Sequence, residues 1–149
     1  MPGPYTFKFF LLINLFLLCG SCVFAQKDPI ERLWYNEEKT AKIEIYKAAD
    51  SKLYGKIIWL KEPLREGRAK IDIHNPDASK RNNPIIGLVI LKGFKKDGKT
   101  EYHDGTIYDP LNGKNYSCKM YYKGDKLEVR GYYGLSIFGR STTWTKAEE

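Results

Sequence analysis

The stretch from Gly105 to Met120, GTIYDPLNGKNYSCKM, is typical of two strands joined by a tight turn. Asp109 can accept hydrogen bonds from the turn backbone, Pro110 presets φ, and Asn112-Gly113 can supply the positive φ that returns the chain. The same residues could suggest a phosphate loop, but the earlier glycines and the strand-loop-helix context of such a loop are absent. The sequence therefore predicts a β-hairpin here, with a turn that fixes the register of both strands.

Alternating apolar and polar residues recur along the chain, and no segment after Pro29 carries a sustained helical stripe. Gly124-Asp125 is a tight-turn signal, and Asp97-Gly98 predicts a type I′ turn, in which both central residues have positive φ. About eight strands with mostly short links predict an all-β fold, an antiparallel up-and-down barrel whose closure removes exposed edges; an open sandwich is the alternative. The expected strands span residues 32–35, 41–47, 52–61, 84–94, 99–109, 114–123, 126–134 and 138–146.

Residues 61–84, KEPLREGRAKIDIHNPDASKRNNP, form one long polar link between two expected strands. Loops of this length in compact domains tend to be lids or binding loops, although a solvated excursion with no role is also open. Asn75-Pro76 is typical of a helix start, with Asn75 as the N-cap and Pro76 at the first helical position. We therefore expect one long, partly helical loop that caps a barrel mouth.

The first 25 residues have the pattern of a secretory signal peptide. Lys8 precedes the apolar run Phe9–Leu18, and Val23-Phe24-Ala25 resembles a cleavage site. The apolar run of about ten residues is too short to span a bilayer, which needs about twenty. We expect a periplasmic or secreted protein with no stable membrane span after cleavage. A lipoprotein anchored through Cys19 or Cys22 is an alternative that the flanking residues match imperfectly.

Cleavage after Ala25 would leave 149 − 25 = 124 residues, 26–149, enough for a single barrel domain. Cys118 would then be the one cysteine, so no internal disulfide could form. The first 25 residues contain one Lys and no acid, so the remaining net charge is +7 − 1 = +6. This charge favours anionic partners, while export argues against nucleic acid.

The inward faces of the expected strands suggest a binding pocket. Tyr116, Cys118 and Met120 share one strand face, and an eight-stranded barrel either fills itself with side chains or holds one small ligand. We expect a small, apolar or amphipathic ligand, with Arg130 or Arg140 meeting its head group. A filled barrel that binds an envelope protein or polymer is the alternative. The expected ligand-binding residues are Trp59, Tyr116, Cys118, Met120, Arg130, Arg140 and Trp144.

The sequence contains few candidates for catalytic or metal-binding residues. His103 and Asp104 are adjacent on an expected strand, so they should face opposite ways, and Asp104 and Asp109 are an odd number of residues apart. The stretch DIHNPD offers Asp72, His74 and Asp77 but matches no defined calcium or zinc pattern. We expect no catalytic residues, no metal and no cofactor; an unrecognised hydrolase is kept as a further alternative.

Four stretches, LYGKIIWL, DIHNPDASKRNNPIIGLVIL, GTIYDPLNGKNYSCKM and LEVRGYYGLSIFGRSTTWT, resemble in order and spacing the bacterial domain-of-unknown-function family 2147. The resemblance covers essentially all of the chain after residue 25. It implies a small exported protein with a lipocalin-like, calycin-type β-barrel, and it brings no established activity. The positions that match the family motifs are Trp34, Asn75, Pro76, Tyr108, Asp109, Pro110, Asn112, Gly113, Gly131 and Gly139.

The first strand of the family usually carries Gly-x-Trp, and here Arg32-Leu33-Trp34 keeps the Trp but not the Gly. In calycin-type barrels this tryptophan is typically covered by a basic side chain from the last strand. The position that matches is Arg140. The resemblance therefore implies a cation-π contact between Arg140 and Trp34.

Overall fold

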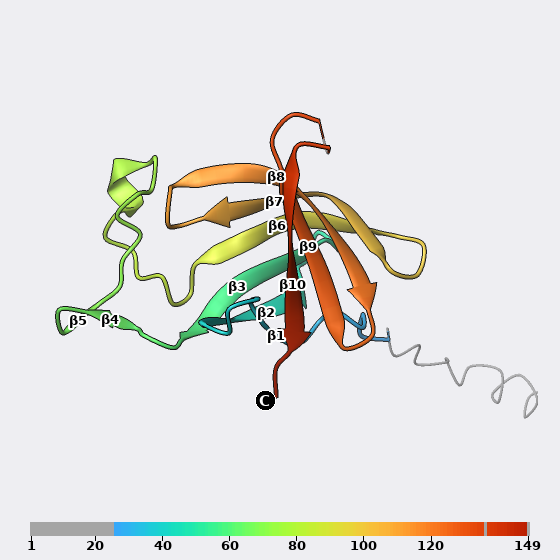
Figure 1. Ribbon diagram of the computed structural model, residues 1–149, viewed down its shortest axis with the longest axis horizontal. Coiled ribbons are helices and arrows are strands. Elements are labelled where there is room, and N and C mark those ends of the chain that lie inside the picture. The colour runs from blue at the N-terminus through green and yellow to red at the C-terminus, as the bar shows by residue number, and fades with distance from the viewer. Residues whose placement is uncertain (1–25, 136, 149) are drawn as a thin grey trace, which may run out of the picture.

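The computed structural model describes residues 26–135 and 137–148, which form a closed antiparallel barrel (Figure 1). The predicted signal peptide lies outside these residues. The strands follow one another around the barrel in the order β1-β10-β9-β8-β7-β6-β3-β2. Their bounds are β1 Leu33–Tyr35, β2 Ala41–Lys47, β3 Leu53–Leu60, β6 Val89–Asp97, β7 Glu101–Asp109, β8 Lys114–Lys123, β9 Lys126–Tyr132 and β10 Gly139–Lys146. The predicted all-β barrel is confirmed.

The hairpin turns differ from the prediction in one detail. Gly113 and Gly124 have positive φ in their turns, at 70° and 78°, and Asp109 Oδ1 accepts a hydrogen bond from Leu111 N at 2.9 Å. At the β6–β7 turn, however, only Gly98 has positive φ, and Asp97 pairs with Glu101 across a three-residue loop. The hairpin forms where expected, but its turn is not type I′.

One end of the barrel is sealed by the segment before β1. Ile30 and Trp34 are fully buried, and Trp34 Nε1 donates to Ile30 O at 2.9 Å. Asp28 holds the segment to the wall, because its carboxylate accepts from Tyr102 Oη at 2.6 Å and pairs with Lys96 Nζ at 2.8 Å. The strands and this seal all lie within residues 28–147, so this part of the chain contains its own core and is expected to fold by itself.

The implied contact between Arg140 and Trp34 is wrong. Trp34 pairs with Lys146 on β10, while Arg140 pairs with Gly131 on β9. Arg140 and Lys146 are six residues apart on β10, so Arg140 lies about 20 Å along the strand from the residue that pairs with Trp34. The Trp34 ring instead meets Tyr122 edge-on, with ring centroids 6.3 Å apart.

A bulge in β7 also corrects the prediction that His103 and Asp104 face opposite ways. Tyr102 pairs with Met120 and Gly105 with Cys118, so β7 has one residue more than β8 across this interval. Asp104 takes the left-handed conformation, with φ of 62°. The extra residue brings His103 Nδ1 to 3.1 Å from Asp104 Oδ1.

The long loop contains a short hairpin, β4 Leu64–Arg65 with β5 Arg68–Ala69, and one turn of 3-10 helix, η1 Ala78–Lys80. The predicted N-cap at Asn75 is wrong, because the cap is Asp77, whose Oδ1 accepts from Ser79 N at 3.0 Å. Asn75 lies two residues earlier, and its Oδ1 accepts a hydrogen bond from Asp77 N at 2.9 Å. The helix is therefore shorter and starts later than Asn75-Pro76 suggested.

The loop backbone rests directly on the β7–β8 turn. A Cβ atom at Gly113 would lie 1.9 Å from the backbone oxygen of His74, a distance that no real side chain allows. Gly113 is thus required twice, once by its positive φ and once by this contact.

Alanine at Gly113 should therefore destabilise the protein more than alanine at Gly124. Gly124 has the same sign of φ but open space around a Cβ, so Gly124→Ala is the matched control. We expect about 1 kcal/mol for Gly124→Ala and at least about twice that for Gly113→Ala. Urea unfolding of both variants measures the difference, and equal losses would contradict the loop contact.

A cavity at the open end of the barrel

The half of the barrel away from the Trp34 seal contains a cavity of about 1100 Å³. Inward side chains of the strands form most of its wall, and the long loop, the β7–β8 turn and the β9–β10 loop form its mouth. The aliphatic and tryptophan side chains of the wall are Ala41, Ile43, Ile57, Leu60, Ile85, Ile90, Ile107, Val129 and Trp144. The interior is therefore mostly apolar.

Three of the seven predicted ligand-binding residues line this cavity: Tyr116, Arg140 and Trp144. Tyr116 contributes a ring and a hydroxyl, and Arg140 a cation. Gly131 and Gly139, both family-motif positions, also line it. A Cβ at Gly139 would lie 2.7 Å from Gly131 O, so the absence of a side chain at Gly139 lets β9 and β10 approach each other. A Cβ at Gly131 would instead lie 3.3 Å from the Ile107 side chain, on the inner face of the barrel.

Cys118 and Met120 do not line the cavity. Both are fully buried in the packed, sealed half of the barrel, and burial raises the pKa of the Cys118 thiol to about 12. Both side chains point into the barrel as predicted, but they lie in the half of the interior that other side chains fill. They are core residues, and Cys118 remains a protonated thiol at neutral pH.

Trp59 and Arg130 lie on the outer face of the barrel. A bulge in β3 places Ile58 between the partners of Ile43 and Lys42, and this one extra residue turns Trp59 outward. There Trp59 meets Tyr35 edge-on, with ring centroids 6.1 Å apart.

Arg130 lies on the face of β9 opposite to Val129 and Gly131, and its Nη1 donates to Ser141 Oγ at 3.1 Å. Of the two arginines expected to meet a head group, only Arg140 lines the cavity.

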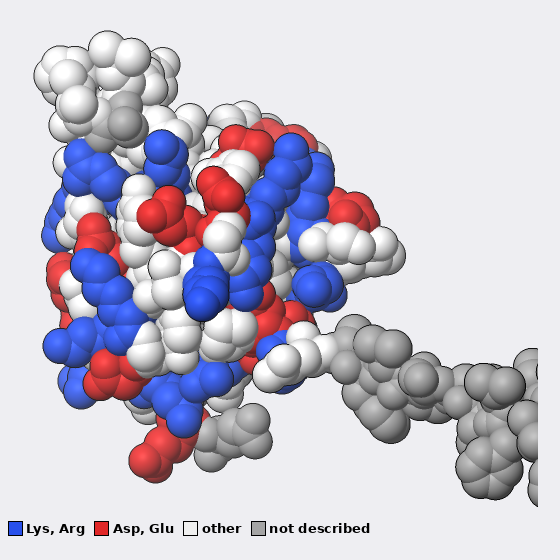
Figure 2. Space-filling view, turned by 90° about the vertical axis from the view of Figure 1, so that its right-hand side faces the viewer, with Lys and Arg blue, Asp and Glu red and all other residues white. Residues whose placement is uncertain are grey.

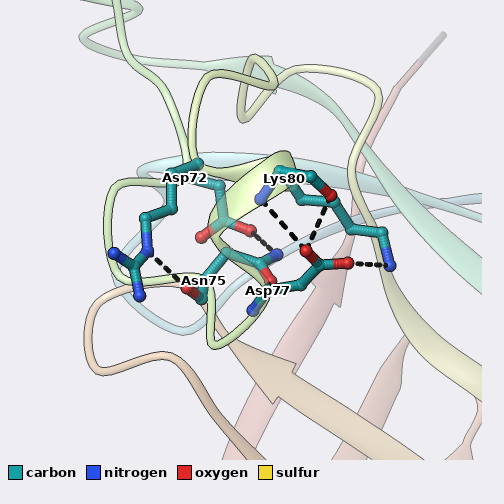
Figure 3. A network of polar contacts seen from close by, with 6 residues as sticks. Asp72, Asn75, Asp77 and Lys80 are labelled. Atoms are coloured by element: carbon teal, nitrogen blue, oxygen red, sulfur yellow. Dashed lines mark hydrogen bonds and ion pairs between the residues drawn. The ribbon is translucent and has the colours of Figure 1, made fainter.

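A buried carboxylate fixes the loop against the mouth. Asp72 is the one fully buried charged residue in the described part of the chain. Its Oδ1 accepts from Tyr108 Oη at 2.8 Å, and its Oδ2 accepts from Asn75 Nδ2 at 2.7 Å. Figure 3 shows Asp72 and Asn75 linked in this way, beside the Asp77 cap of the helix turn.

The network continues through backbone groups. Asp72 N donates to Asn83 O at 2.9 Å, and Arg81 Nε donates to Asn75 O at 2.8 Å. Residues far apart in the loop are thus held together around one carboxylate. The sequence predicted no role for Asp72, because DIHNPD matches no metal pattern and a polar loop carries no periodicity that marks a buried position.

Tyr108 connects the loop to the barrel. Burial, together with the hydrogen bond to Asp72, raises the pKa of Tyr108 to about 12. The phenol therefore stays protonated and donates to the carboxylate over the whole physiological range.

The β7–β8 turn contributes a polar edge to the mouth. Asp109, Pro110, Leu111 and Asn112 all line the cavity. Asn112 Nδ2 donates to Asp109 Oδ2 at 2.9 Å and to Tyr116 Oη at 3.1 Å. The turn that fixes the strand register thus also holds the Tyr116 hydroxyl at the opening.

The candidate catalytic residues are not brought together. His103 and Asp104 form a partly exposed pair with Lys95 at the far end of β7, whereas Asp109 lies at the cavity mouth, about 16 Å along the strand. Among the described residues, no group of three or more His, Cys, Asp or Glu side chains could hold a metal ion. In the same part of the chain, no helix is long and apolar enough to cross a membrane.

A closed eight-stranded antiparallel barrel with a cavity at one end defines a lipocalin-like protein. A solved structure of protein HP1028 from the human pathogen Helicobacter pylori, described as belonging to the lipocalin family, superimposes with a TM-score of 0.72. The two chains are 24% identical over 80% of this chain and 84% of that one, a likeness that shows the fold. No curated protein matches the chain significantly.

The family follows from a match over residues 33–146. The chain belongs to the family described as "Uncharacterized protein conserved in bacteria (DUF2147)". The predicted family resemblance is confirmed.

Removing the Tyr108 hydroxyl should loosen the loop. Tyr108→Phe leaves Asp72 buried with one donor fewer, so we expect a loss of about 2 kcal/mol in the free energy of unfolding at pH 7. Tyr54→Phe is the matched control, since Tyr54 Oη donates to Asp50 Oδ2 at the same 2.8 Å but on the surface, where water replaces the donor. Its effect should be much smaller, and an equal effect would contradict the importance of burial.

The pH dependence gives a second readout of the same bond. The folded-state pKa of Tyr108 lies above its ordinary value of 10.0, so its contribution is complete below pH 10 and is lost as the pH rises through about 12. The difference in stability between wild type and Tyr108→Phe should be flat below pH 10 and should shrink above it. Denaturant titrations from pH 7 to 11.5 measure this, and a difference that does not shrink would contradict the assignment.

Proposed function

We propose that this protein binds one small, mostly apolar ligand inside the barrel. The observation that carries the proposal is the cavity of about 1100 Å³, walled by aliphatic side chains and Trp144. Sites for small molecules are typically about 300–1000 Å³, mostly apolar, with a few polar anchors. Tyr116, Asn112 and Arg140 are such anchors, and they come from β8, the β7–β8 turn and β10.

We further propose that the ligand carries an anionic head group. Arg140 is an exposed cation on the cavity wall, and it pairs with Gly131, which carries no side chain beside it. A guanidinium presents a planar fork of donors that matches a carboxylate or phosphate. The long loop, held by Asp72, would cover the ligand from the other side of the mouth.

The proposed setting is outside the cytoplasm, in the periplasm or beyond, because residues 1–25 have the pattern of a secretory signal peptide. An apolar ligand is poorly soluble in such a compartment. A barrel that buries it would act as carrier or store.

The alternative of a filled barrel used only as an interaction module is less well supported, because only the half around Trp34, Cys118 and Met120 is packed. A hydrolase is also less well supported, because Asp109 lies far from the His103 and Asp104 pair. We retain ligand binding as the function that the geometry supports best.

Filling the cavity should abolish binding. Thr142 lines the cavity, whereas Thr143 is exposed on the opposite face of β10. We expect Thr142→Trp to weaken binding of a fluorescent fatty acid by about tenfold or more, because a large side chain would occupy the ligand volume. Thr143→Trp is the matched control and should bind like wild type.

Native mass spectrometry of the protein purified without detergent gives an independent test of the same proposal. A spectrum without added mass, combined with no rise in melting temperature across a panel of fatty acids and lipids, would remove the proposal.

The head-group assignment is tested by a pair of arginine variants. Arg140→Gln should weaken binding of a fatty acid by about tenfold but leave binding of the matching uncharged alcohol nearly unchanged, since only the acid pairs with the guanidinium. Arg130→Gln removes the same charge from the outer face of β9. If both variants lose affinity equally, the effect is general charge rather than the Arg140 contact.

A further inference from the structure

The β9–β10 loop exposes a cluster of large apolar side chains. Between β9 and β10 the chain reads YGLSIFG over residues 133–139 and contains no charged residue. The exposed fractions of its large side chains are Tyr133 79%, Leu135 68%, Ile137 73% and Phe138 69%. The loop rises above the barrel at the top of Figure 1, and Figure 2 shows an uncharged knob at the top of the molecule with Lys and Arg side chains directly below it.

The apolar side chains are held outward by the backbone of the loop. Gly134 has a φ of 68°, Phe138 N donates to Leu135 O at 3.0 Å, and Tyr133 N donates to Phe138 O at 3.4 Å. Leu135 and Ile137 thus project away from the barrel, whereas Tyr133 and Phe138 are exposed at the rim of the cavity. Contiguous exposed apolar patches on soluble proteins mark contact with a partner or a membrane.

The charges around the loop indicate which of these applies. No Asp or Glu occurs between Glu128 and Glu148, while Arg130 and Arg140 stand at the two ends of the loop. Apolar and aromatic residues flanked by cations fit the interfacial region of a bilayer, where the rings and aliphatic chains enter the acyl boundary and the cations meet anionic head groups. A net charge of +7 on the whole chain favours the same partner at longer range.

We propose that the β9–β10 loop docks the protein onto the surface of an anionic lipid bilayer. Tyr133 and Phe138 also line the cavity, so docking places the cavity mouth at the membrane. An apolar molecule could then pass between bilayer and barrel without crossing water. Docking itself does not require the proposed ligand, because Leu135 and Ile137 lie outside the cavity lining.

The experiment uses the chain from residue 26, which contains the complete barrel and its seal. Co-sedimentation is measured with phosphatidylglycerol-containing vesicles and with pure phosphatidylcholine vesicles. We expect wild type to bind the anionic vesicles, and the binding to weaken with salt. Leu135→Asp/Ile137→Asp should reduce the partition coefficient by about tenfold or more, because two carboxylates would have to enter the interface.

The control is Leu64→Asp/Ile86→Asp, which makes the same two replacements at exposed positions outside the loop. It should bind the vesicles like wild type. Binding of a soluble fluorescent fatty acid should survive in Leu135→Asp/Ile137→Asp, so a failure of docking and a failure of ligand binding are distinguished. Melting temperatures show that the variants are folded.

Three outcomes would overturn the proposal. Wild type could fail to bind anionic vesicles at low salt, or the loop variant could bind them as well as the control. In the third, wild type would form a dimer that the loop variant disperses, with no binding to vesicles, which would assign the loop to a second copy of this chain.

Discussion

The hydrogen bond from Tyr108 to the buried Asp72 carboxylate is the interaction on which the open half of the barrel depends. The loop of 24 residues, 61–84, has few apolar side chains to bury, so packing alone would not hold it in one place. A buried carboxylate is costly unless donors surround it, and here Tyr108 and Asn75 supply them from β7 and from the loop. Any movement of the loop off β7 would remove the Tyr108 donor from that carboxylate. The penalty for breaking the network is therefore what gives the cavity a fixed wall.

The barrel is divided into a packed half and a hollow half by the size of its inward side chains. Phe94 can cross the sealed half because Gly105 opposite carries no Cβ, which would lie 2.5 Å from the ring. Toward the mouth the pattern reverses, and Gly131 lines the cavity without a side chain of its own. Gly105 thus makes room for the Phe94 ring in the packed half, whereas Gly131 adds no side chain to the cavity. Trp34 and Ile30 close the packed end, so the cavity opens at the other end, beside the long loop, the β7–β8 turn and the β9–β10 loop.

The alternation of apolar and polar residues was sufficient to predict about eight strands, because each strand of a barrel has one face in the interior and the other in solvent. The short links between the strands favoured a closed barrel over an open sandwich. The alternation could not predict the bulges. The extra residue in β3, Ile58, turns Trp59 outward, and the extra residue in β7 brings the Asp104 carboxylate to His103. Neither bulge can be recognised from the residue types in its strand. The sequence also did not predict how far along the barrel axis the packed half ends and the cavity begins. Met120 and Tyr116 share a face, yet only Tyr116 lines the cavity, because other side chains fill the barrel around Met120.

The same reasoning explains how far the likeness to the Helicobacter protein extends. At 24% identity the two chains keep the fold, since many apolar inward residues and many polar outward residues satisfy the same period and the same closure. Under the proposed function, the ligand would be selected by a few side chains of the cavity wall, here Arg140 and Tyr116, which the fold does not constrain. A position such as Arg140 can change without cost to the barrel, because it lies in a cavity and not in the packed half. The proposed ligand of this chain therefore has to be inferred from the lining of its own cavity, and the apolar rim at Tyr133 and Phe138 belongs to that lining as much as the interior does.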